Sequence, residues 1–137
     1  MRNSLFLFLV FTSMLFGGCK NNKIDIKKAL IGTWELRKKT GGPKNVSTNF
    51  KPGNRILLAF TENRFHEFSR GQVASMGHYR IIDDTLKLSG KISKRLIFKP
   101  EVYPEDSARF FVDFHNNQLL ITEDNVGGLT RFYERIK

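Results

Sequence analysis

Short runs in which apolar and polar residues alternate follow one another along most of the chain, and turn-forming residues separate them. Residues 85–89 form one such run, residues 110–114 a second, and Phe132 and Ile136 belong to a third, which Glu134 interrupts. A period of two residues predicts strands with one buried and one wet face. Nine strands are predicted, at residues 33–39, 55–60, 64–69, 72–82, 85–89, 95–99, 109–114, 118–122 and 130–136.

One short helix is predicted ahead of these strands. Residues 25–31 carry Ile26, Ala29 and Leu30 at helical spacing, Asp25 can cap the helix, and Gly32 can end it. No helical period is sustained further along the chain. We therefore expect an all-β fold, an eight- to nine-stranded antiparallel up-and-down barrel with a short N-terminal helix, since closure removes the edges of a sheet.

The first eighteen residues have the pattern of a signal peptide rather than of a folded element. A basic start is followed by an apolar run at residues 5–16, which is shorter than the ~20 residues of a membrane span. Gly17-Gly18-Cys19 then resembles the cleavage box of bacterial lipoproteins, which implies that Cys19 becomes a lipid-modified first residue. A cleaved soluble protein and an uncleaved anchor are the alternatives. The expected division is a signal peptide at 1–18, a lipid-anchored linker at 19–24 and a barrel domain at 25–137.

Charge and cysteine content narrow the location and the partners. The chain has 137 residues, a net charge of +10 and a single Cys, which indicates one domain with no internal disulfide. A basic surface often binds nucleic acid, but an exported protein meets little of it. Lys20, Lys23, Lys27 and Lys28 lie beside Cys19 and can attract an anionic membrane surface. Some bacterial surface lipoproteins resemble one another in carrying acidic residues right after the lipid-modified Cys, as an export signal. Residues 20–23 contain no acidic residue, which favours the periplasmic face of the outer membrane within the cell envelope.

The start of the first predicted strand carries the only Trp of the chain, in Gly32-Thr33-Trp34. This motif and the ending at residues 131–136 resemble the compact lipocalin-like lipoproteins of the Bacteroidetes group. The resemblance implies that Trp34 closes one end of the barrel and that an Arg of the last strand packs on its ring. Arg131 is the first candidate for this role and Arg135 the second.

Patterns that would indicate catalysis are absent from the sequence or weak. It has no nucleophile elbow, no glycine-rich phosphate loop and no pair of His at metal-ligand spacing, although His66 and His78 could meet across neighbouring strands. The acidic pairs at residues 83–84 and 123–124 fall in predicted turns, where Asp is favoured for backbone reasons. We therefore expect a binding protein rather than an enzyme, without a metal or other cofactor.

The predicted strand at 72–82 indicates which residues face the barrel interior. Ser75, Gly77 and Tyr79 alternate with His78 and Arg80, so the first set is expected inside, together with Val73 and Ile81. An apolar wall of Phe110, Val112 and Phe114 is expected to complete a binding site in which Tyr79 orients the ligand. Two functions stay open: a lipid-anchored carrier of a small apolar ligand, and a protein-interaction module, such as an inhibitor or an accessory of an envelope complex, with a barrel filled by side chains.

Overall fold

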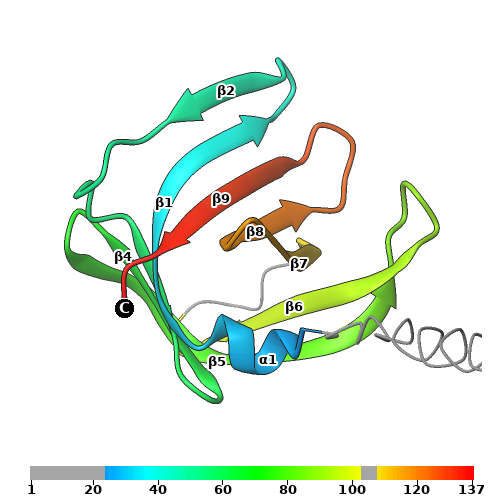
Figure 1. The fold of residues 1–137 in the computed structure, drawn as a ribbon. Coiled ribbons are helices and arrows are strands. Elements are labelled where there is room, and N and C mark those ends of the chain that lie inside the picture. Colours follow the sequence, from blue (N-terminus) through cyan, green and yellow to red (C-terminus); the bar gives the residue numbers. More distant parts are fainter. Residues whose placement is uncertain (1–23, 103–107) are drawn as a thin grey trace, which may run out of the picture.

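The computed structural model describes residues 24–102 and 108–137, so Cys19 and the predicted signal peptide lie outside the described residues. One short helix, α1 (Ile26–Leu30), precedes nine strands (Figure 1). The strands are β1 (Gly32–Gly41), β2 (Val46–Asn49), β3 (Leu57–Phe60), β4 (Arg64–Ser69), β5 (Gln72–Thr85), β6 (Ile92–Pro100), β7 (Phe110–His115), β8 (Gln118–Glu123) and β9 (Leu129–Arg135).

Eight of the strands close into an antiparallel barrel, which confirms the predicted fold class. Neighbours in the sequence pair in order from β3 to β9, and β1 joins both ends by pairing with β3 on one side and β9 on the other. Strand β2 lies outside this ring and pairs only with residues 38–41 of β1 (Figure 1). The register of β1 against β9 shifts at Arg37, and beyond this bulge β1 leaves β3 and pairs with β2.

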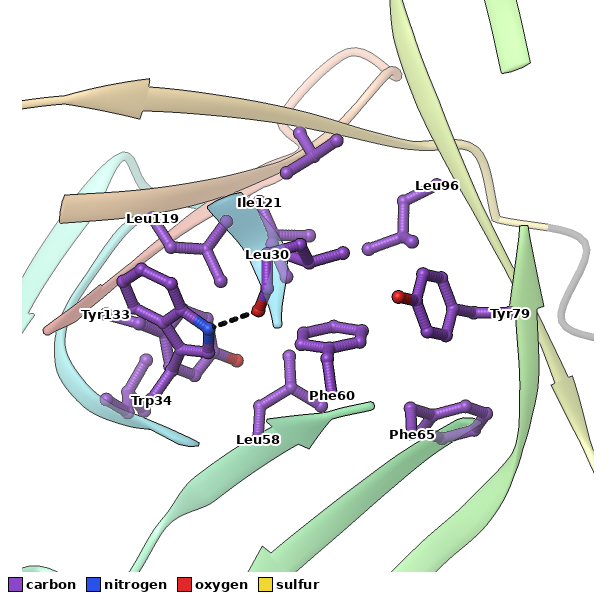
Figure 2. Packing of buried hydrophobic residues seen from close by; sticks show 12 residues of the cluster. Leu30, Trp34, Leu58, Phe60, Phe65, Tyr79, Leu96, Leu119, Ile121 and Tyr133 are labelled. Atoms are coloured by element: carbon purple, nitrogen blue, oxygen red, sulfur yellow. Dashed lines mark hydrogen bonds between the residues drawn. The ribbon is translucent and has the colours of Figure 1, made fainter. Parts of the chain in front are cut away.

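Helix α1 closes one end of the barrel. The side chain of Asp25 accepts a hydrogen bond from the Lys28 backbone N–H at 3.3 Å and so caps the helix as predicted. Leu30 is fully buried and joins the core, where its carbonyl accepts a hydrogen bond from Trp34 Nε1 at 2.8 Å (Figure 2). Among the described residues, no helix has the length and apolar character needed to cross a bilayer.

The prediction of a strand at residues 85–89 was wrong, and strand β2 was not predicted. Strand β5 continues to Thr85, and residues 86–91 form the turn to β6, closed by a hydrogen bond from the Leu86 N–H to the Lys91 carbonyl at 2.9 Å. A contact remote in sequence stabilises this turn, because the Lys87 N–H donates to the Asp124 carboxylate at 2.9 Å. Strand β2 was missed because all its residues are exposed, so it carries no buried-face pattern.

Apolar side chains from all eight barrel strands pack together in the interior with Leu30 of α1 (Figure 2). The most deeply buried include Trp34, Leu36, Leu96 and Leu119. On β9 the inward positions are the opposite of those expected, because Tyr133 is buried while Ile136 is exposed. The alternation of Phe132 with Ile136 therefore marks the outer face of that strand.

The loop before β3 is fastened to the outer side of β1 by a buried carboxylate. Glu35 is 4% exposed and accepts hydrogen bonds from the Gly53 N–H at 3.2 Å, from the Arg55 N–H at 3.4 Å and from the Arg37 guanidinium. Burial alone would raise the pKa of Glu35, but the Gly53 N–H and the Arg37 cation outweigh it and lower that pKa. Glu35 is therefore held as a carboxylate in the folded chain.

Candidate ligand cavity

The motif at the start of β1 builds the closed end of the barrel. Trp34 is 2% exposed, and the Arg135 guanidinium lies over its ring at 4.4 Å from the centroid. Arg135 also donates to the carbonyls of Ile31, at 2.7 Å, and Ala29. A Cβ on Gly32 would lie 2.6 Å from Arg135 Nη1, so glycine leaves the room that this arginine needs.

The prediction that Arg131 packs over Trp34 was wrong, and the second candidate, Arg135, holds that position. Arg131 and Arg135 face the same side of β9 but lie a full four residues apart. Arg131 therefore lies further from α1. Its guanidinium carbon is 5.6 Å from the centroid of the Phe110 ring, and its Nη2 donates to Glu123 Oε1 at 2.8 Å. This arginine belongs to a different part of the interior.

That part is a cavity of about 220 Å³ in the half of the barrel away from α1. Every strand from β3 to β9 contributes to its lining. The lining residues are Leu58, Phe65, Glu67, Ser75, Phe98, Pro100, Phe110, Ile121, Arg131 and Tyr133. The aromatic rings pack edge to face, with 4.7 Å between the centroids of Phe65 and Phe98 and 5.8 Å between those of Phe98 and Phe110. The wall of the cavity is thus mostly aromatic, with a polar group on four of its ten residues.

The structure brings two of the six predicted ligand-binding residues to this cavity. Ser75 and Phe110 line it. Val112 is part of the packed core, and the Phe114 ring packs on Trp34 with 5.6 Å between centroids, at the closed end.

Strand β5 corrects three further expectations. Tyr79 faces inward, but its hydroxyl donates to the Thr61 carbonyl at 2.7 Å, so it fastens the turn between β3 and β4 instead of facing a ligand. Gly77 approaches the backbone of β6, where an added Cβ would lie 2.1 Å from the Lys99 carbonyl oxygen. Val73 is 54% exposed, because a bulge between β4 and β5 reverses the alternation before Ser75.

The polar side of the cavity was not predicted and includes Tyr133. This residue is 6% exposed, and among the described residues its hydroxyl has no hydrogen-bond partner. Burial raises the pKa of Tyr133; the charge of Arg131 lowers it and that of Glu67 raises it. The sequence signal was the pair of residues 131 and 133, which share a strand face, but the apolar neighbours Phe132 and Ile136 concealed it.

A second cluster of charges lies on the outside of the barrel and is structural. Arg95 Nη1 and Arg109 Nη2 each lie 3.0 Å from Asp84 Oδ2, and Arg109 Nη1 lies 3.6 Å from Asp124 Oδ2. The Thr85 N–H and the Arg95 guanidinium lower the pKa of Asp84. One member of each acidic pair, Asp84 and Asp124, therefore forms ion pairs with Arg95 and Arg109, whereas Asp83 pairs with Lys94 and Glu123 with Arg131. Within the described ranges, no three His, Cys, Asp or Glu side chains are grouped as metal ligands would be.

Comparisons with the models of known protein families, with curated proteins and with solved structures gave no match for this chain. Function is therefore inferred from the residues and the geometry of the cavity. The resemblance to lipocalin-like lipoproteins stays a prediction.

Proposed function

We propose that this protein is a lipid-anchored, lipocalin-like binding protein of the cell envelope that holds a small apolar ligand inside its barrel. The observation that carries the proposal is the cavity of about 220 Å³ with its aromatic wall. Small-molecule sites in proteins are concave and mostly apolar, with a few polar groups that fix orientation. A barrel completely filled by side chains, which the interaction-module alternative requires, would not leave this space.

The position of α1 supports an orientation of the barrel on a membrane. Five residue steps separate Cys19 from Ile24, the first described residue, and such a segment spans at most about 18 Å. A lipid on Cys19 would therefore keep the α1 end close to the bilayer. Lys27 and Lys28 are exposed at that end and suit an anionic surface. The cavity lies in the opposite half of the barrel and would face away from the membrane.

The anchor is tested by metabolic labelling with radioactive palmitate. Wild type should incorporate label and fractionate with membranes, because two or more acyl chains hold a protein stably to a bilayer. The Cys19→Ala chain should lose both properties. Label that persists in Cys19→Ala would refute acylation at this residue.

The cavity is tested with a matched pair of substitutions on adjacent positions of β5. Ser75→Leu replaces a side chain of two heavy atoms in the cavity by one of four, whereas Ala74→Leu places the same leucine on the exposed outer face. An apolar fluorescent dye should bind wild type and Ala74→Leu equally and bind Ser75→Leu at least tenfold more weakly. Equal dye binding by all three folded proteins would place the dye on the surface and contradict a binding cavity.

A further inference from the structure

Three of the four polar residues of the cavity, Tyr133, Ser75 and Arg131, can donate hydrogen bonds, and the fourth, Glu67, is an exposed carboxylate. Tyr133 and Ser75 each carry a hydroxyl with no hydrogen-bond partner among the described residues. Arg131 uses Nη2 for Glu123, at 2.8 Å, and its guanidinium has further N–H groups beside the Phe110 ring. None of these groups is among the buried polar atoms that lack a partner, so they are open to water in the cavity. A ligand that displaces this water must offer an acceptor to the donors that it covers, because a donor left unpaired is costly.

Burial keeps Tyr133 in its donor form. Its raised pKa means that the phenol stays protonated throughout the ordinary pH range. In wild type this hydroxyl is therefore available to donate to a ligand oxygen at any pH at which the protein is studied.

The charges around the cavity disfavour a charged ligand of either sign. Arg131 is already paired with Glu123, which does not line the cavity, and Glu67 is the one carboxylate of the lining. An anionic ligand would meet a guanidinium that is already paired, together with the carboxylate of Glu67. A cationic ligand would meet the guanidinium beside Tyr133 and Ser75, while the carboxylate of the lining, Glu67, is exposed and therefore screened by water. Burying a charge without its own partner is expensive, so neither ion fits.

From these contacts we infer that the ligand is an uncharged molecule with an apolar body and a single carbonyl-type oxygen acceptor, bound by Tyr133 with Ser75 and Arg131 beside it. At ~30 Å³ for each water-sized group, the volume of about 220 Å³ corresponds to about seven such groups. The class is therefore a short-chain ketone, aldehyde or ester. This inference rests on the proposed function, because it assigns the chemistry of the same cavity.

The test is isothermal titration of the full chain, kept soluble by an amphipathic polymer, with four ligands of seven carbons: 2-heptanone, heptanoate, heptylammonium and toluene. The polymer alone serves as the blank. Wild type should bind 2-heptanone at least tenfold more tightly than either ion. Tyr133→Phe should weaken 2-heptanone binding about three- to tenfold, as the loss of one hydrogen bond does, and leave toluene binding unchanged.

Tyr79→Phe is the matched control, because its hydroxyl bonds the Thr61 carbonyl and not the cavity. It should leave the affinity for 2-heptanone unchanged. Tight binding of heptanoate or heptylammonium, or an equal response of 2-heptanone to both Tyr→Phe variants, would overturn the ligand class while leaving the binding function intact. Binding of none of the four ligands by wild type would overturn the proposed function itself.

Discussion

Replacement of Arg135 by Ala removes the side chain that joins the last strand to both the helix and Trp34. Its guanidinium lies 4.4 Å from the centroid of the Trp34 ring and donates to the carbonyls of Ile31 and Ala29 at the end of α1. Carbonyls at a helix C-terminus lack intrahelical partners and carry partial negative charge, so a cation there is favourable. The variant should therefore loosen the closed end while leaving the strands in place.

The magnitude follows from three terms. The cation–π contact contributes ~0.5–2 kcal/mol, and each hydrogen bond contributes ~0.5–1.5 kcal/mol net. Arg135 is an exposed residue, so the lower part of each range applies. The sum is about 2 kcal/mol, which at ~3–5 °C per kcal/mol for a domain of this size corresponds to a Tm lower by about 6–10 °C.

Thermal unfolding of Arg135→Ala is measured by far-UV circular dichroism and by the fluorescence of Trp34, the only Trp of the chain. Fluorescence should report the loosened end directly, since Trp34 is buried in wild type. Arg135→Lys should recover part of the loss, because it keeps the charge but not the planar stacking. Arg80→Ala, an exposed arginine on β5, is the control and should match wild type. An Arg135→Ala protein with wild-type Tm and fluorescence would refute this reading of the closed end.

Three more substitutions test other parts of the barrel. Trp34→Ala should lower the free energy of unfolding by ~3–5 kcal/mol in urea denaturation, as large aromatic truncations in a core do, and an unchanged midpoint would show that Trp34 is not a core residue. Glu35→Gln should lower the Tm most at pH 6–7. The gap should narrow as the pH falls below about 4.5, because a lowered native pKa stabilises the fold above the unfolded value and loses that effect in acid. A constant gap across this pH range would contradict the ion-paired Glu35. Gly77→Ala should lower the free energy of unfolding by about 3 kcal/mol in urea denaturation, because its Cβ meets the β6 backbone. A wild-type free energy of unfolding would contradict this close contact.

Most of the barrel was predictable from the sequence because its strands alternate and its turns are marked. The prediction for residues 64–69 matches β4 in both bounds, and the last three strands agree within one residue at each end. Part of the hairpin tip at 86–91 was predicted as a strand, since Leu86 and Leu88 alternate with polar residues. Its conformation depends on Asp124, a partner remote in sequence that a local pattern cannot show.

The cavity was predicted only in part, because alternation shows which residues face inward but not where along the barrel they lie. Alternation correctly placed Ser75 and Phe110 on the interior, but it could not tell which inward residues meet the core and which meet the cavity. On β9 the apolar residues Phe132 and Ile136 lie on the outer face, so Tyr133 was not predicted to face inward and Arg131 was assigned to the closed end instead of the cavity. Which Arg packs on Trp34 depends on the height of each residue along the barrel, which the closed geometry sets.

The most direct test of the cavity is a measurement of where a bound ligand lies. The full chain in the amphipathic polymer is saturated with 2-heptanone, and intermolecular nuclear Overhauser effects are recorded between the ligand and the aromatic rings. Transfer should reach the ring protons of Phe110 and Tyr133, which line the cavity, and not the indole of Trp34 at the closed end. Transfer only to exposed side chains, or to Trp34 alone, would contradict a ligand held inside this half of the barrel.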